Sequence, residues 1–120
     1  MKVMISQPMR GKTNAQIRTE RAGVVRRLKE DGFDVVDTII NDEPPKDSDE
    51  AIFYLGKSIE FISMVDVVYF MKGWHKARGC MIEHAVCQHY GKQTMYVMYD
   101  SDANRDLYTA LDEEVKNNDI

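Results

Sequence analysis

The chain has 120 residues, of which 43% are hydrophobic and 30% charged, and its net charge is -4 at neutral pH. This composition is typical of one globular domain, residues 1–120, and excludes disordered and collagen-like chains. The acidic balance argues against a protein that grips a nucleic acid polymer over a broad basic face. A small phosphorylated ligand is not excluded, because it needs only one or two local cations.

The cysteines and the hydropathy of the chain bear on its compartment. Cys80 and Cys87 lie in one predicted helix, about 10 Å apart along its axis at roughly 1.5 Å per residue, which is too far for a disulfide. Two reduced thiols suit the cytosol. No segment is long and apolar enough for a membrane span or a signal peptide. We therefore expect a cytoplasmic protein that does not contact a membrane.

The first third of the chain predicts a strand followed by a long helix. Residues 2–6, KVMIS, are short and apolar, as a buried strand is. Thr13 and Gln16 have the spacing of a capping box, which predicts a helix from Asn14 to Asp31. Gly32 then stands where a left-handed residue ends many helices.

The rest of the chain continues the same alternation of strands and helices. The patterns predict strands over 33–38, 66–71 and 93–99, a proline-containing loop over 41–49, and helices over 49–62, 80–90 and about 104–116. The run DVVYFM is apolar almost throughout, as strands buried on both faces of a parallel sheet are. The order predicts an α/β domain, a parallel sheet with helices on its faces, in one of a few doubly wound arrangements.

Ligands of such sheets bind beyond the carboxyl ends of the strands. In the turn SQPMRGKT, which follows the first strand, Gly11 allows a close approach of the backbone and Arg10 could make a bidentate contact with a phosphate or carboxylate. The N–H groups of the helix that starts near Thr13 attract anions. A plain turn with a solvated Arg10 is an equally good interpretation.

A second candidate stretch is KGWHKARGCMIEHA, residues 72–85. Glu83 lies about one turn inside the following helix. Its carboxylate can point toward the carboxyl ends of the strands, over the same crevice as residues 6–11, and act as a nucleophile or general acid. Taken alone, Glu83 is better explained as a solvated or capping residue near a helix N-terminus. Trp74 could stack on a base, or equally cover the core edge or a subunit contact.

Cys80, His84 and Cys87 recur at i, i+4 and i+7 on one helical stripe. The two thiols are too far apart for one tetrahedral ion with metal–sulfur bonds near 2.3 Å. We therefore predict a packed helix face here, with no metal site and no cofactor.

Three stretches in register carry a family resemblance: the turn SQPMRG, then SIEFISMVDVVYFM, then ARGCMIEHA. Together they resemble the nucleoside 2-deoxyribosyltransferase-like superfamily, and most closely its small uncharacterised branch from phages and bacteria. Matching order and spacing cover residues 1–99. The resemblance implies a small Rossmann-like (flavodoxin-like) parallel sheet of four to five strands flanked by helices. It also implies a small-molecule nucleoside or nucleotide as substrate, and a homodimer or higher homo-oligomer whose contacts use the second and third helices.

The resemblance further implies the roles of individual residues. In this family the glutamate of a G-x-x-x-E motif, here Glu83, attacks the anomeric carbon of the N-glycosidic bond, and water or another base then takes the sugar. In the 5′-phosphate hydrolase branch, the turn that corresponds to Pro8–Gly11 binds the phosphate. The implied substrate-binding residues are Ser6, Gln7, Pro8, Met9, Arg10, Gly11, Ser58, Gly73, Trp74, Arg78 and Gly79.

Three positions depart from the pattern of active relatives. Met4 stands where a tyrosine orients the glutamate, Ser58 where an aspartate protonates the leaving base, and Ala77 where a polar residue is frequent. Loss of a general acid typically costs about 10²–10⁴ in rate. His75, Glu60 or a residue of a neighbouring subunit could replace it.

These features leave hypotheses of different classes open. The first is an enzyme that cleaves the N-glycosidic bond or transfers the deoxyribosyl group. The second is a catalytically weak or inactive binder of a nucleotide or nucleotide-derived signal in the same crevice. The third is an oligomeric structural domain without a ligand.

Overall fold

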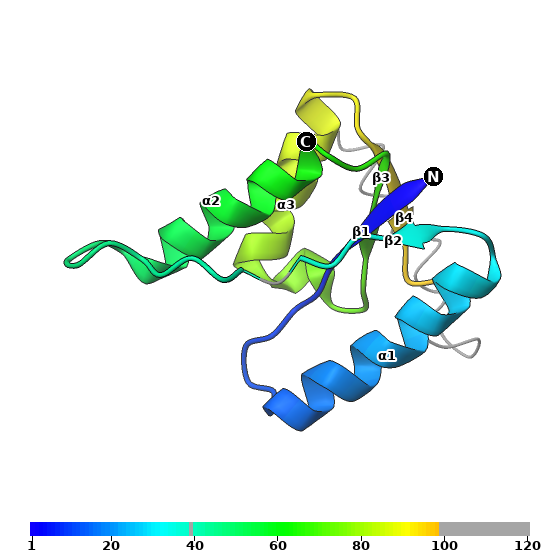
Figure 1. Ribbon diagram of the computed structural model, residues 1–120, viewed down its shortest axis with the longest axis horizontal. Coiled ribbons are helices and arrows are strands. Elements are labelled where there is room, and N and C mark those ends of the chain that lie inside the picture. The colour runs from blue at the N-terminus through cyan, green and yellow to red at the C-terminus, as the bar shows by residue number, and fades with distance from the viewer. Residues whose placement is uncertain (39, 99–120) are drawn as a thin grey trace.

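The computed structural model describes residues 1–38 and 40–98, so the helix expected over 104–116 lies outside the described residues. Strands and helices alternate as predicted (Figure 1). The elements are β1 (Lys2–Ser6), α1 (Asn14–Glu30), β2 (Asp34–Val35), α2 (Glu50–Ile62), β3 (Val67–Phe70), the 3₁₀ helix η1 (Trp74–Lys76), α3 (Arg78–His89) and β4 (Gln93–Tyr96). None of the helices in these two ranges is both long and apolar enough to cross a membrane.

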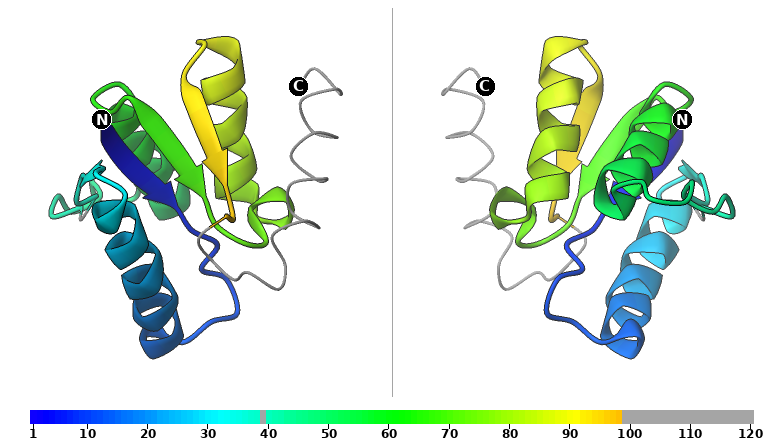
Figure 2. Two further views of the ribbon diagram at one scale, coloured as in Figure 1. Left: turned by 90° about the vertical axis from the view of Figure 1, so that its right-hand side faces the viewer. Right: turned by 90° about the vertical axis from the view of Figure 1, so that its left-hand side faces the viewer.

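The four described strands form one parallel sheet in the order β2-β1-β3-β4. The chain therefore moves from β1 to one edge and then crosses back over β1 to build the other half of the sheet. Figures 1 and 2 show α1 on one face of the sheet and α2 with α3 on the other. The expected fold class, a small Rossmann-like α/β sheet flanked by helices, is confirmed.

The alternation of side chains along each strand divides the core into two layers, because successive residues of a strand point to opposite faces. Val3 and Ile5 of β1 pack with Val24 and Leu28 of α1. Met4 lies in the layer under α2 and α3. The same pleat directs Ser6 to the α2–α3 face, at the carboxyl end of β1.

Local signals explain the boundaries of α1. The capping box is present: Thr13 Oγ1 accepts from the Gln16 N–H at 3.1 Å, and Gln16 Oε1 accepts from the Thr13 N–H at 2.8 Å. The helix ends at Glu30, and Gly32 adopts the positive φ of 89° that was predicted after its last turn.

Three predicted strands are shorter than expected, and the one predicted over 66–71 covers only Val67–Phe70. The prediction of a strand over 33–38 is wrong beyond Val35, because β2 is an edge strand with only two residues in register with β1. The strand predicted over 93–99 ends at Tyr96. The left-handed φ of 32° at Val97 turns the backbone out of the extended conformation there.

The segment between the predicted strand over 66–71 and the predicted helix over 80–90 also contains helical structure. Gly73 turns the chain with a φ of 86°, η1 follows directly, and α3 begins at Arg78 rather than Cys80. The helix therefore starts closer to the sheet edge than the sequence pattern indicated.

Candidate functional site

The candidate site lies where β1 and β3 end side by side. Ser6 is in register with Phe70, and the Met71 N–H donates to the Ser6 carbonyl at 3.0 Å. From these ends the chain goes to α1 on one face and to α3 on the other, so the two loops diverge beyond the carboxyl ends of the strands, where ligands of parallel sheets bind. The loops also touch, because a Cβ on Gly73 would lie 3.7 Å from Pro8 Cγ.

Glu83 is buried on α3, beneath the carboxyl ends of β1 and β3. Its side chain is one of four on α3 that face the sheet at i, i+3, i+4 and i+7, together with Cys80, His84 and Cys87. Only 9% of its surface is exposed. The interpretation of Glu83 as a solvated residue at the helix start is therefore wrong.

The Ser6 hydroxyl acts on the carboxyl of Glu83. Burial raises the pKa of the Glu83 carboxyl, and the Ser6 hydroxyl partly offsets this by favouring the charged form. Burial also raises the pKa of the Cys80 thiol to about 11, again with an opposing contribution from Ser6. The hydroxyl of Ser6 therefore lies within reach of both groups, and Cys80 is a neutral thiol at physiological pH.

Three buried side-chain atoms in the described part of the chain have no hydrogen-bond partner of good geometry: Ser6 Oγ, Gln7 Oε1 and His75 Nδ1. All three lie on the segments that leave the ends of β1 and β3. Buried polar atoms nearly always have a partner in a native structure. Because all three atoms lie near the carboxyl ends of the central strands, this end of the sheet is a candidate place for a polar ligand.

Gln7 offers an acceptor with a defined orientation. Its Nε2 donates to the Ile17 carbonyl of α1 at 2.9 Å, and only 7% of the residue is exposed. Because a carbonyl oxygen can only accept, the amide nitrogen must face Ile17. The orphan Oε1 is therefore a fixed acceptor that requires an N–H or O–H donor.

The first turn of α3 is open to an anion. Its N-cap residue, Ala77, has no side chain that can cap, and the first turn contains no acidic residue. Apart from its chain neighbours and the backbone of α3 itself, no described atom lies within 4 Å of a Cβ built on Gly79. Free N–H groups at such a helix start attract negative charge.

The start of α1 differs from this. The expectation of free N–H groups there is wrong for Thr13 and Gln16, because the capping box uses both. Arg10 and Met9 are exposed in the loop, and Gly11 turns the chain with a φ of 78°. An anion at this loop would therefore have to contact Arg10 and backbone N–H groups outside the capped turn.

The remaining predicted site residues occupy different environments. Trp74 is 4% exposed and packs against His84 with ring centroids 4.4 Å apart, which supports the core-edge interpretation and not base stacking. Arg78 and Gly79 are exposed at the start of α3. Ser58 is half-buried in the middle of α2.

The stripe of Cys80, His84 and Cys87 is a packed helix face, as predicted, with both thiols free. Within the described ranges, no three His, Cys, Asp or Glu side chains are placed to bind a metal ion. The His84 Nε2 lies 2.6 Å from the Tyr96 hydroxyl, and burial lowers the pKa of His84 to about 4. His84 is therefore a neutral core residue.

Sequence reasoning predicted that Ser6 and Glu83 lie at the same strand ends, but it missed Cys80 as a neighbour of both. One signal was available: the i, i+3 spacing of Cys80 and Glu83 places both on the same helix face. The pleat of β1, which directs Ser6 toward them, could be recognised only once the face covered by α3 was known.

Comparison with known proteins identifies a family without an assigned activity. A family model described as a domain of unknown function, DUF4406, matches residues 1–96. No curated protein and no solved structure matches the chain. The matched segment includes all four described strands and the crevice residues from Ser6 to Glu83. The chain therefore belongs to the DUF4406 family.

Proposed function

We propose that this protein is a nucleoside or nucleotide N-glycosidase or deoxyribosyltransferase, a member of the nucleoside 2-deoxyribosyltransferase-like superfamily, with Glu83 as its nucleophile. One observation carries the proposal. A buried carboxyl of raised pKa lies within reach of the Ser6 hydroxyl at the carboxyl end of β1, and the segments that leave β1 and β3 there carry unpartnered buried polar atoms of Gln7 and His75. Such a set of perturbed and unsatisfied groups is typical of a functional site.

The proposed reaction uses these groups in two displacements. The ionised Glu83 attacks the anomeric carbon, the bond to the base breaks, and the base leaves with a proton. Water then hydrolyses the glycosyl ester, or a second base accepts the sugar. The hydroxyl of Ser6 favours the ionised nucleophile. The candidate donor of the proton with which the base leaves is His75 in its protonated form, and because burial lowers the pKa of His75 this donation is favoured at acidic pH.

The same geometry suits the other end of a nucleotide. The open first turn of α3, with Arg78 and Gly79, and the exposed Arg10 could neutralise a 5′-phosphate. Gln7 Oε1 could accept from a sugar hydroxyl or a base amino group. These contacts supply binding energy without taking part in bond cleavage.

A specific observation favours a second candidate, a binder without turnover. Met4 is buried in the core, where it offers no hydrogen bond to orient Glu83. The raised pKa of Glu83 also reduces the ionised fraction at a given pH. A protein with these features could bind a nucleotide or nucleotide-derived signal in the same crevice.

We also propose that the protein forms a homodimer or higher homo-oligomer through α2 and α3. The helix α2 is rich in apolar residues, yet only Ile62 within it is buried. Ile52 is 67% exposed, and Met81 and Ile82 are exposed on α3, which lies beside α2 on the same face (Figure 1). An exposed apolar patch of this kind typically marks an interaction site. The two free cysteines support a cytoplasmic location, in a bacterium or a phage-infected host.

Incubation with pooled nucleosides, deoxynucleosides and their 5′-monophosphates, followed by mass spectrometry, tests the activity. We expect free base with the wild type, none with Glu83→Gln, and wild-type levels with the matched control Glu43→Gln, which changes an exposed loop residue. Equal base release by Glu83→Gln would refute the nucleophile. No release, with one compound retained after desalting, would support the binder instead.

A further inference from the structure

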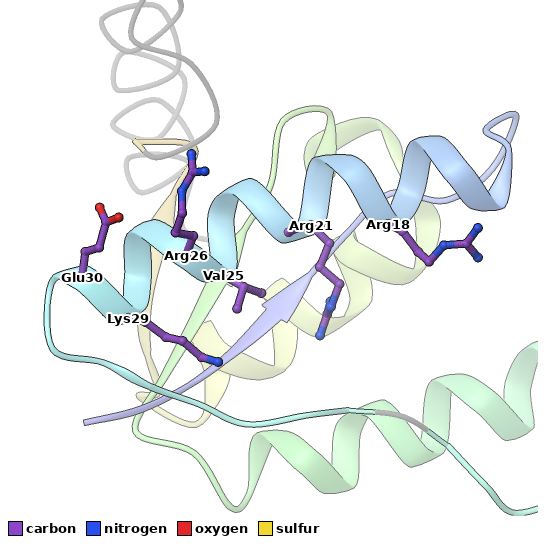
Figure 3. Close-up of a pocket in the computed structure, with 7 residues that line it drawn as sticks. Arg18, Arg21, Val25, Arg26, Lys29 and Glu30 are labelled. Carbon is purple, nitrogen blue, oxygen red and sulfur yellow. The ribbon is translucent and has the colours of Figure 1, made fainter.

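The basic side chains of α1 do not converge on one point (Figure 3). In that view Arg26 points away from Arg21 and Lys29. Arg21 is also engaged already, since its Nη2 donates to Thr38 Oγ1 at 3.3 Å. Titratable side chains gather instead on the buried face of α3, where Cys80 has no part in the proposed reaction.

The direction of α3 places Cys80 at the same end of the sheet as Ser6. The helix begins beyond the carboxyl end of β3 and leads back to the start of β4, which is parallel to β3, so it runs antiparallel to these strands. Its first turns therefore lie toward the carboxyl ends of the strands. Cys80 is in the first turn, whereas Cys87 lies about two turns further along the helix.

Ser6 faces the first turns of α3. Met4 lies in the core layer that contains Cys80 and Cys87, and Ser6 points to the same face because it is two residues further along β1. Only 2% of Ser6, 5% of Cys80 and 9% of Glu83 is exposed. These three polar side chains are therefore enclosed together, between the carboxyl end of β1 and the start of α3.

The Ser6 hydroxyl distinguishes the two thiols of α3. Burial raises the pKa of both Cys80 and Cys87 to about 11, but the hydroxyl opposes that effect only at Cys80. It also opposes the effect of burial on the pKa of Glu83. This difference agrees with the positions of the two cysteines along the helix, and it makes Cys87 a matched reference for Cys80.

Charged groups from neighbouring elements act mainly on the thiols. Within the described ranges, Lys12 lowers the pKa of Cys80 from the turn after β1, and Lys92 lowers that of Cys87 from the turn before β4. The influences on the pKa of Glu83 itself are burial and the serine hydroxyl. A change in that hydroxyl should therefore be visible in the pKa of Glu83.

The direction of the hydrogen bonds follows from the protons available. The Ser6 hydroxyl has one hydrogen to donate and two lone pairs that accept. Cys80 is a neutral thiol at physiological pH, so it can donate, whereas an ionised Glu83 can only accept. The arrangement that satisfies all three groups runs from thiol to hydroxyl to carboxylate. Ser6 Oγ has no described partner of good geometry, as is common for catalytic groups before a ligand binds.

We propose that Cys80 is a positioning residue: its S–H donates to Ser6 Oγ, so that the Ser6 O–H donates to the Glu83 carboxylate. The assignment of Glu83 as the nucleophile rests on the proposed function, but this chain of hydrogen bonds can be measured without turnover. Hydrogen bonds in a chain polarise one another, so the thiol strengthens the bond from Ser6 to the carboxylate. Cys80 therefore favours the ionised nucleophile without contacting the substrate.

NMR titration of the Glu83 carboxyl in the full chain tests this proposal. Cys80→Ala removes the donor and should raise the pKa of Glu83, by less than Ser6→Ala does, because the hydroxyl remains. Water admitted by the smaller side chain would lower this pKa instead, so the sign of the shift separates the two effects. Cys80→Ser restores a donor and should return the pKa to the wild-type value or below it. The matched control, Cys87→Ala, should leave it unchanged.

The double variant Ser6→Ala/Cys80→Ala shows whether Cys80 acts through Ser6. It should raise the pKa of Glu83 no further than Ser6→Ala alone, because the chain is already broken. Additive shifts in the double variant would overturn the proposal. A Cys80→Ala protein whose Glu83 pKa is not above that of the wild type, or an equal shift in Cys87→Ala, would also overturn it.

Infrared spectra keep the test valid if a Cys80 variant fails to fold. In Cys87→Ala the remaining S–H stretch belongs to Cys80, and adding Ser6→Ala should move it to higher frequency, since the thiol loses its acceptor. An unchanged band would overturn the proposal. Base release that depends on Glu83, without any effect of Cys80, would keep the nucleophile and reject the positioning role. The predicted shifts in a protein that releases no base would do the reverse.

Discussion

Glu83 lies beside the Ser6 hydroxyl, and this environment governs the pH range in which the carboxylate is ionised. Burial raises the pKa of Glu83, and Ser6 lowers it in part. A nucleophile must be deprotonated, so kcat/KM should rise with pH through the raised pKa. Ser6→Ala removes the lowering influence, and the acidic limb of the profile should move to higher pH. An unchanged limb in Ser6→Ala would contradict this role; NMR titration of the Glu83 carboxyl provides the same readout for a protein without turnover.

The same burial should reduce the stability of the folded protein at neutral pH. The unfolded chain ionises Glu83 near pH 4.5, whereas the folded protein keeps the proton to higher pH. Unfolding therefore releases a proton above pH 4.5, so the free energy of unfolding falls as the pH rises. Glu83→Gln lacks this loss and should be more stable than the wild type at pH 7. Below about pH 4 the difference should disappear, because the carboxyl is then protonated in both states.

Urea denaturation at the two pH values measures this difference. Glu43→Gln, at an exposed position, should match the wild type at both. A Glu83→Gln protein that is less stable than the wild type at pH 7 would show that the buried carboxylate is stabilised by interactions stronger than its desolvation.

At the scale of single elements, α1 depends on its capping box. Thr13→Ala removes the side-chain acceptor for the Gln16 N–H and should cost about 1 kcal/mol. Thermal unfolding should show a lower midpoint for this variant. Thr19→Ala, an exposed substitution inside the same helix, should not lower it, because alanine has the higher helix propensity. Equal effects of the two changes would refute the contribution of the cap.

The two glycines around η1 should respond differently to alanine. Gly73 has a φ of 86°, and alanine there should cost about 1–2 kcal/mol from backbone strain, since the nearest atom to the new Cβ, Pro8 Cγ, is at an ordinary distance. Gly79 lies in α3 with open space around it, so Gly79→Ala should leave the stability of the protein unchanged or increase it. The methyl group would instead obstruct a ligand at the helix start. Denaturation and ligand titration on both variants separate the two effects, and equal stability would contradict the strain at Gly73.

Helices and strands were predictable where residues close together in the sequence determine the structure. The capping box at Thr13 and the continuous apolar run of β3 each determine their structure locally, and both were predicted correctly. The ends of β2 and β4 were not predictable, because they depend on how far each edge strand keeps a partner. The left-handed backbone at Val97 was also not predictable, because no residue pattern in the sequence indicates it.

The candidate site was predictable in part for a related reason. The turn residues after β1 and the glutamate in α3 indicated the correct end of the sheet, the carboxyl ends of β1 and β3. The burial of Glu83 and the position of Ser6 depend on which face α3 covers, which is set by tertiary packing. The burial of Trp74 likewise follows from its contacts with Phe70 and His84 in the folded core.

At the scale of the whole molecule, the exposed apolar surface of α2 and α3 should be covered by a second copy. Ile52→Glu and Met81→Glu place a charge in that patch and should convert the oligomer to monomers, as measured by light scattering after size-exclusion chromatography. Ala15→Glu, at an exposed position of α1 on the other face, should leave the mass unchanged. A monomeric wild type, or an oligomer that survives both charged substitutions, would contradict this assembly.

The strand order β2-β1-β3-β4 has a consequence for synthesis on the ribosome. Val3 pairs with Val35 on one side and with Val67 on the other. Val67 is synthesised later than Val35, so the second pairing forms only after β3 has been made. Until β3 emerges, the nascent chain contains β1 with one edge unprotected, next to a partner strand of only two residues. Such an edge can pair with other chains. Translation pauses before β3, or products truncated there, should therefore be the conditions under which this protein aggregates and requires chaperones.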